Sequence, residues 1–193
     1  MHDCLPENRL ARCGLARDPQ SDSALAGAAA GALPRGPGYT IWDRPGYLVR
    51  RLHQIHVGLF LRHVADGQMT PVQYGLLSIL VNRPGIDQSM ICEELGLDRA
   101  NVADILKRLE SRELVSRVVD PENRRRKLCL ATPLGKEFVT RYRADMQRSQ
   151  KKLLSPLSAD EQAVFMDLLS RLVQGNNEGS RTALRPGGEQ LDL

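Results

Sequence analysis

The sequence predicts a mainly α-helical fold with one small β-hairpin. Apolar residues recur three and four positions apart through most of the stretch between Tyr47 and Gln174, which is the period of an amphipathic helix. Between Leu114 and Ala131 the pattern changes to two short alternating runs, and the residues Asp120–Asn123 between them favour a turn. We therefore expect helices on both sides of a single hairpin.

Length and charge limit the classes of protein to consider. The chain has 193 residues, which suits one domain with tails, and its net charge of +4 favours a polyanionic partner. It contains no apolar run of about 18 residues, the length that a membrane-spanning helix needs. The stretch Ala24–Leu33 is rich in Ala and Gly rather than in Leu, unlike a signal peptide, so we expect a cytoplasmic protein.

The first part of the chain divides into a tail and a helix. Residues 1–38 are interrupted by Pro and Gly and predict a disordered or partly docked N-terminal tail. A helix follows from Tyr47 to Ala65, with two adjacent stripes at helical spacing: Leu48, Leu52, Ile55 and Leu59, then Val49, His53, His56 and Phe60. This apolar area is wider than one small domain can cover, which predicts contact with a second copy of the chain.

His53 and His56 interrupt the second stripe and leave two interpretations open. They are either hydrogen-bonded side chains at a helix interface or a polar lining for an acidic ligand. Metal binding is disfavoured because the other histidines are His2 and His63, and we expect no metal and no cofactor.

The next helix begins at Thr70. Thr70 and Gln73 form a capping box, Pro71 occupies the first helical position, and Asn82–Gly85 ends the helix. We expect Tyr74 to lie on the core face of this helix, with its hydroxyl available to a pocket.

Two capped helices follow in close succession. Asp87 caps the first, Gly96 ends it, and Asp98 caps the second. In the second helix, Val102, Ile105, Leu106 and Leu109 form an apolar stripe. Two helices joined by a short turn that contains Gly make a helix-turn-helix.

The face opposite that apolar stripe suits DNA. It carries Ala100, Asp104, Lys107 and Ser111, with Asn101 and Arg108 on its flanks, and these short, hydrogen-bonding or cationic side chains can enter a major groove. Asp104 is the exception, since a carboxylate repels phosphates. It must accept a hydrogen bond from a cytosine amino group, pair with a neighbouring Arg, or lie off the DNA.

The hairpin carries a run of cations beside this helix. Strands predicted at Leu114–Val119 and Lys127–Ala131 enclose a loop with Arg124, Arg125 and Arg126, and Lys127 completes the run. A charge run alone is often a solvated loop. Next to a helix-turn-helix, it fits a wing that reaches the minor groove. In all, we expect DNA contacts from the following residues: Gln88, Ser89, Arg99, Ala100, Asn101, Asp104, Lys107, Arg108, Arg124, Arg125, Arg126 and Lys127.

Two more helices are predicted after the hairpin. One begins at Thr132 and Pro133 and runs to about Leu154, and the capping box of Ser158 and Glu161 begins the last helix. Residues 175–193 show no pattern and predict a C-terminal tail.

Several of these segments resemble the MarR (multiple antibiotic resistance regulator) family of transcription factors. The similar segments are Thr70–Tyr74, Leu109–Val115, Asp120–Arg125 and Leu130–Gly135, although Asn123 stands where the family usually has an aspartate. The resemblance covers roughly Arg44 to Gln174. It implies a winged helix-turn-helix within 39–174, with a DNA-binding lobe at 70–131 and an all-helical dimerisation layer at 45–66 and 133–173.

The resemblance also implies a function. Regulators of this family bind palindromic operators as homodimers, and we expect a repressor that a small ligand releases from DNA. The segments Gln54–Phe60 and Thr70–Tyr74 resemble a subgroup of regulators of aromatic-compound catabolism that senses aromatic acids or their coenzyme A thioesters. The expected effector-binding residues are Arg50, His53, His56 and Tyr74, where a cation and imidazoles would meet a carboxylate and the phenol a ring hydroxyl.

Other functions find less support. An enzyme is disfavoured because the sequence has no glycine-rich phosphate loop, nucleophile elbow or metal cluster. A winged helix used only for protein contacts is disfavoured by Lys127 and the arginines before it. A thiol-based redox sensor of the same fold stays open, because Cys92 and Cys129 fall within the folded region.

Overall fold

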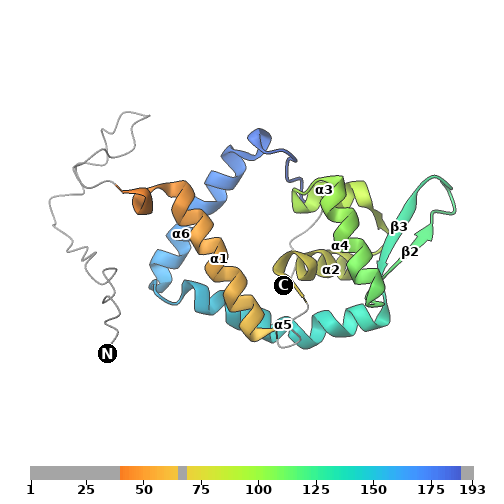
Figure 1. Cartoon of the computed structure of the whole chain (residues 1–193), viewed down its shortest axis with the longest axis horizontal. Coiled ribbons are helices and arrows are strands. Elements are labelled where there is room, and N and C mark those ends of the chain that lie inside the picture. The colour runs from red at the N-terminus through yellow and green to blue at the C-terminus, as the bar shows by residue number, and fades with distance from the viewer. Residues whose placement is uncertain (1–39, 65–68, 188–193) are drawn as a thin grey trace, which may run out of the picture. The chain divides into compact units, whose positions relative to one another are not determined.

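The computed structural model describes residues 40–64 and 69–187 (Figure 1). The predicted N-terminal tail, residues 1–38, lies outside the described residues. The short 3-10 helix η3 (Ile41–Asp43) is begun by a capping box in which the Asp43 carboxylate accepts from the Thr40 amide at 2.9 Å.

Helices form most of the remaining structure. They are α1 (Pro45–His63), α2 (Pro71–Asn82), α3 (Gln88–Leu95), α4 (Arg99–Ser111), α5 (Pro133–Leu154), α6 (Ala159–Gly175) and the 3-10 helix η4 (Asn177–Gly179). The predicted capping boxes at Thr70 and Ser158 are confirmed, and Thr132 caps α5 as expected. These caps use side chains to satisfy amides that have no partner inside the helix, and so the sequence sets where each helix begins.

The sheet has one strand more than the sequence predicted. The expected hairpin consists of β2 (Val115–Val119) and β3 (Lys127–Ala131), which pair antiparallel from Val115 opposite Ala131 to Val119 opposite Lys127. A further strand, β1 (Ile86–Asp87), pairs with the other edge of β3, giving the order β1-β3-β2. Two residues are too short to show an alternating pattern, which is why the sequence did not reveal β1.

The core lies where α2, α3, α4, the sheet and the start of α5 meet. Its fully buried side chains include Leu76, Leu80, Ile91, Leu106 and Cys129. Phe60 near the end of α1 and Val64 just after it join this core, and α1 packs along α5. The helix-turn-helix is therefore part of a single packed unit with the sheet.

A close approach at Gly135 joins α5 to this unit. A Cβ atom at Gly135 would lie 2.2 Å from the Leu114 carbonyl oxygen, so any larger residue would push α5 away from the start of β2. The Thr132 hydroxyl donates to the Glu113 carbonyl oxygen at 2.7 Å beside it. These contacts fix the direction in which α5 leaves the sheet.

Large apolar side chains on α1 and α6 are exposed in the single chain. They are Leu48, Val49, Ile55 and Leu61 on α1, and Val164, Met166, Leu168, Leu172 and Val173 on α6. None of the residues of α6 is buried. Apolar area of this extent is typical of an interaction surface.

The structure describes the predicted C-terminal tail, residues 175–193, as far as residue 187. Residues 176–187 form η4 and then a segment whose Arg185 amide donates to the Glu93 carbonyl oxygen of α3 at 2.6 Å. This docking could not be predicted from the sequence, because single hydrogen bonds hold the segment rather than a periodic apolar face.

Candidate nucleic-acid interface

The turn between α3 and α4 is built by its capping residues. The Asp87 carboxylate accepts from the amides of Ser89 and Met90 at 2.9 and 3.0 Å, and Gly96 ends α3 in the left-handed conformation with φ of 61°. The Asp98 carboxylate then accepts from the Asn101 amide at 2.9 Å and begins α4. This confirms both predicted caps.

Helix α4 separates its apolar residues from its polar ones as predicted. Val102, Ile105, Leu106 and Leu109 are buried. The opposite residues are exposed, and they are Ala100, Asn101, Asp104, Lys107, Arg108 and Ser111. Packing of the apolar stripe therefore fixes which side chains α4 presents to a partner.

Three of the predicted DNA contacts also brace the turn. The Arg99 guanidinium donates to the Ser89 hydroxyl at 2.7 Å, and the Gln88 amide group donates to the Arg99 carbonyl oxygen at 2.9 Å. These bonds join the first turn of α3 to that of α4. They orient Arg99 and Ser89 on the same side of the motif.

Asp104 is exposed, and it forms no ion pair within the described part of the chain. Pairing with a neighbouring Arg is thus not what this structure shows. The two remaining interpretations are a hydrogen bond from a cytosine amino group and a position off the DNA.

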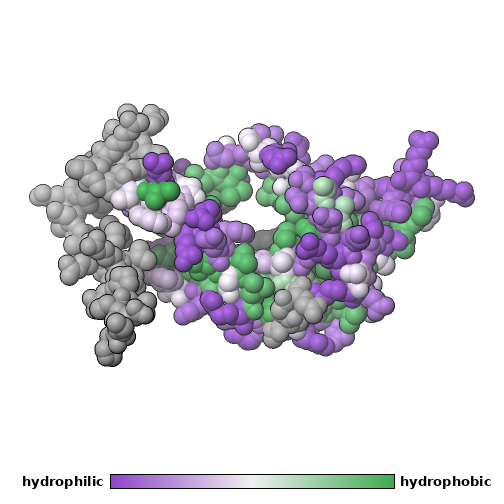
Figure 2. Space-filling model, in the orientation of Figure 1, coloured by the Kyte–Doolittle hydropathy of each residue, from purple (hydrophilic) through white to green (hydrophobic). Residues whose placement is uncertain are grey.

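The hairpin projects beyond the helices, and its tip is hydrophilic (Figures 1 and 2). Arg124, Arg125 and Lys127 are exposed at this tip. The Asn123 side chain accepts from the Arg125 amide at 3.1 Å and shapes the turn. Three of the four cations in the predicted run are therefore presented to solvent.

Arg126 differs from its neighbours. Its guanidinium pairs with Asp87 at 2.7 Å and with Asp120 at 3.6 Å, and it is partly buried. It links the hairpin to the cap of α3, so its charge is already neutralised by two carboxylates. The sequence shows four consecutive basic residues, but it does not show which of them pairs with acidic residues distant in the chain.

The pKa of Asp87 lies below its ordinary value. Burial acts in the opposite direction, but it is outweighed by the hydrogen bonds from the Met90 amide, from Arg126 and from the Ser89 amide, together with the charge of Arg126. A carboxyl group whose pKa is lower in the folded chain stabilises the fold above its unfolded pKa of about 3.9. That stabilisation is lost as the pH falls through the folded pKa.

We expect Asp87→Asn to lower the free energy of unfolding at pH 7 by about 1 kcal/mol, because Asn retains the N-cap and loses the partly exposed ion pair with Arg126. Urea unfolding at pH 7, 4 and 3 measures the difference from the parent, which should shrink below about pH 4. Asp98→Asn is the matched control, since no described arginine pairs with that cap. An equal loss for Asp87→Asn at every pH would contradict this assignment.

The predicted effector residues do not all meet in one place. The Arg50 guanidinium lies over the Tyr47 ring at 5.1 Å, and the rings of His53 and His56 are 6.4 Å apart. Burial, with a smaller contribution from the charge of His53, lowers the pKa of His56. His56 thus favours its neutral form on α1.

The expectation that the Tyr74 hydroxyl is available to a pocket is wrong in this structure. Tyr74 is buried against Phe60, and its hydroxyl donates to the Val139 carbonyl oxygen at 3.3 Å. Burial raises the pKa of the phenol. The residue joins α2 to α5, because the same face of α2 that packs into the core also faces α5.

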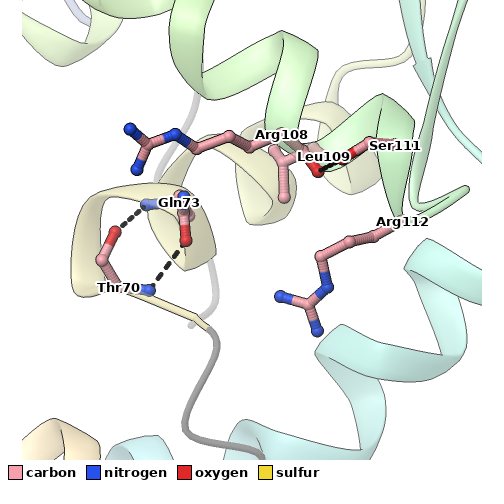
Figure 3. A pocket seen from close by; sticks show the side chains of 6 residues that line it. All are labelled: Thr70, Gln73, Arg108, Leu109, Ser111 and Arg112. Atoms are coloured by element: carbon pink, nitrogen blue, oxygen red, sulfur yellow. Dashed lines mark hydrogen bonds between the residues drawn. The ribbon is translucent and has the colours of Figure 1, made fainter.

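A cavity of about 310 Å³ lies between the start of α2 and the end of α4 (Figure 3). Arg108 reaches from α4 over the capping box of Thr70 and Gln73, whereas the Arg112 guanidinium lies 5.6 Å from the Phe138 ring of α5. Leu109 and Ser111 complete the lining. Arg112 was not among the predicted site residues, although its spacing of four from Arg108 places both on one helix face.

The two cysteines of the folded region are buried. Burial raises the pKa of both thiols, that of Cys129 to about 11. Redox-sensing thiols are exposed and have a lowered pKa, so neither side chain has the character of a sensor. The described residues contain no cluster of three or more potential metal ligands, and none of the described helices is long and apolar enough to cross a membrane.

This chain is similar in sequence to known transcriptional regulators. A sequence model described as the MarR family matches residues 68–126, which include the helix-turn-helix and the first strand and loop of the hairpin. A protein of Thauera aromatica named as a transcriptional regulatory protein for the hcr operon is 30% identical over 134 residues, covering 69% of this chain and 81% of the relative.

Solved structures agree with these matches. The PcaV transcriptional regulator of Streptomyces coelicolor, in complex with its natural ligand, is 38% identical with a TM-score of 0.66, covering 72% of this chain and 98% of PcaV. BpsR of Bordetella bronchiseptica, whose DNA binding is regulated by 6-hydroxynicotinic acid, is 26% identical with a TM-score of 0.66, covering 71% of this chain and 97% of BpsR.

Proposed function

Because this chain belongs to the MarR family of transcriptional regulators, we propose that it is a repressor that binds a palindromic operator as a homodimer. A small aromatic acid, or its coenzyme A thioester, releases it from the DNA. Its partners are thus double-stranded DNA, a second copy of the chain and the effector, and its site of action is the cytoplasm.

The side chains that α4 exposes give the strongest support for DNA binding. Its apolar stripe is buried, so Asn101, Lys107 and Arg108 face outward. The exposed cations of the hairpin tip extend from the same lobe, where they can follow the helix onto an adjacent minor groove. Gln88, Ser89, Arg99 and Ala100 contact the backbone or base edges near the turn.

The exposed apolar residues of α1 and α6 support the homodimer. Ile55 on α1 is 41% exposed and Leu172 on α6 is 61% exposed in the single chain. A second copy would cover both helices. Two-fold symmetry then places the two α4 helices about 34 Å apart, on successive major grooves.

Two places can receive the effector carboxylate. His53 and His56 on α1, with Arg50 nearby in sequence, form the first, and its imidazole N–H groups would donate to the carboxylate. The cavity with Arg108 and Arg112 forms the second, and its volume of about 310 Å³ is at the lower end of the range for small-molecule pockets. A ligand there would touch α4 directly. The relative BpsR, which responds to an aromatic acid, supports this class of effector.

We expect an aromatic acid or thioester to lower operator affinity about 100-fold, which needs about 2.7 kcal/mol of coupling. The measurement is release of a labelled duplex by benzoates, hydroxybenzoates, hydroxycinnamates and their thioesters. His53→Ala and His56→Ala test the first place, and Arg112→Gln tests the second without removing Arg108 from DNA. Whichever substitution raises the half-effective ligand concentration locates the carboxylate.

Release of the duplex by an oxidant in place of these compounds would indicate another kind of regulator. If none of these compounds releases the duplex whereas hydrogen peroxide does, the effector proposal fails. Cys92 or Cys129 would then have to become accessible through an opening of the core, and the chain would be a thiol-based regulator of the same fold.

A further inference from the structure

The chain after α6 turns back and reaches α3 (Figure 1). The Asn176 side chain donates to the Leu172 carbonyl oxygen at 2.8 Å and ends α6, and η4 follows at once. We call residues 177–185 the C-terminal strap. This segment lies between the last helix of the predicted dimerisation layer and the first helix of the helix-turn-helix.

Asn177 holds the strap in a closed loop. Its side-chain oxygen accepts from the Leu184 amide at 2.8 Å, and its side-chain nitrogen donates to the Leu184 carbonyl oxygen at 2.9 Å. The Ser180 hydroxyl lies 2.7 Å from the Asn177 carbonyl oxygen and 2.6 Å from that of Thr182. Both main-chain groups of Leu184 are therefore bonded within the strap, which fixes the residue that meets α3.

The closed loop packs on the end of α3. The Arg185 amide donates to the Glu93 carbonyl oxygen at 2.6 Å, which satisfies one of the carbonyl groups that a helix end leaves without an internal partner. A Cβ atom at Gly96 would lie 3.5 Å from the Thr182 carbonyl oxygen and 3.6 Å from Leu184 Cβ. A side chain at this position would thus touch the strap, so the strap passes close to the glycine that ends α3.

Docking of the strap on α3 affects how α3 and α4 can move. Helix α3 packs on α4, and the bonds around Gln88, Ser89 and Arg99 join their first turns. Because the strap is joined to the end of α6, a displacement of this pair away from α6 must break the bond between Arg185 and Glu93 or open the loop that Asn177 closes. The strap therefore limits how far α4 can move relative to the end of α6.

We propose that the strap positions the DNA-binding helices and so sets the separation at which the homodimer reads two operator half-sites. This inference rests on the proposed function. Leu184 and Asn177 act as positioning residues that need not touch DNA. Without the strap, each DNA-binding lobe could take a wider range of positions before binding. The homodimer would then accept a wider range of half-site spacings.

The experiment uses a palindromic duplex selected from a random pool by the full chain, and the same duplex lengthened by one base pair between its half-sites. The full chain should prefer the selected spacing about tenfold or more. The double variant Asn177→Ala, Leu184→Ala should bind the two duplexes within about threefold. Arg181→Ala is the matched control, since Arg181 is exposed in the same strap and should keep the parent's preference.

Two further measurements separate positioning from other roles. Affinity for a single half-site, and the slope of affinity against salt concentration, should be the same in parent and double variant, because the strap contributes no phosphate contact. Leu184→Ala alone provides the comparison should the double variant have a lower melting temperature. Hydrogen exchange should find the Arg185 amide protected in the parent and exposed to exchange in the double variant.

An unchanged spacing preference in the variants would overturn the inference while leaving the proposed function intact. A smaller salt slope with the spacing preference retained would also overturn it, since the strap would then contact phosphates. A full chain that selects no palindromic duplex would instead contradict the proposed function itself.

Discussion

Ile55→Glu is expected to lower affinity for a palindromic operator at least about 100-fold. Ile55 lies on the exposed apolar face of α1, outside the core that holds the DNA-binding lobe together. A buried carboxylate without a partner would oppose association of two copies. Each DNA-binding lobe would then bind its half-site as part of a monomer. It would lose the gain in affinity that comes from linking two binding modules. A binding titration with light scattering on the free protein measures affinity and association together.

Gln54→Glu is the matched control for this prediction. It introduces the same charge at the adjacent position, where the side chain is exposed and polar. This variant should remain dimeric and bind the operator within about threefold of the parent, as exposed surface substitutions usually do. A stable Ile55→Glu monomer that still binds a full palindrome as tightly as the parent would exclude α1 from the interface.

Arg125→Ala is expected to weaken operator binding by about 1–3 kcal/mol, which is roughly 10- to 100-fold, with little change in stability. Arg125 is exposed at the tip of the hairpin, and its side chain forms no ion pair within the described residues. Its guanidinium is therefore free to enter a groove, where the negative potential attracts arginine. Equilibrium binding at several salt concentrations and thermal unfolding measure the two effects separately.

Arg126→Ala is the comparison variant, because Arg126 is adjacent to Arg125 in the chain but pairs with two carboxylates. It removes the pairs with Asp87 and Asp120, so we expect a loss of stability of about 1–3 kcal/mol, because two partly buried carboxylates lose their partner. Equal losses of stability in both variants, or equal affinity of Arg125→Ala and parent for the operator, would contradict this division of roles.

The sequence predicted the fold well where local chemistry decides it. Family and fold class are confirmed, as is the expectation that the chain is a regulator rather than an enzyme. Residues such as Thr70, Asp87, Asp98 and Ser158 fix helix starts through bonds to amides two or three positions away, so they can be recognised without tertiary information.

The features that the sequence did not reveal depend on partners distant in the chain. Arg126 is separated from Asp87 by 39 positions, and Tyr74 from Val139 by 65. Strand β1 exists because β3 offers it an edge, and the strap docks through a bond to a carbonyl group at the end of α3. The cavity beside Arg112 likewise needs α2 and α4 to meet. Periodicity and capping carry no information on such contacts.

Above all, we expect two copies of this chain to bind one palindromic operator through α4 and the hairpin. The most direct measurement is hydroxyl-radical footprinting on a duplex that the protein itself selects from a random pool, with the mass of the complex determined in the same buffer. We expect two chains for each duplex and two protected half-sites whose centres are about 34 Å apart, one helical turn. A single chain on a single half-site, or failure to select any sequence over random duplex, would contradict it.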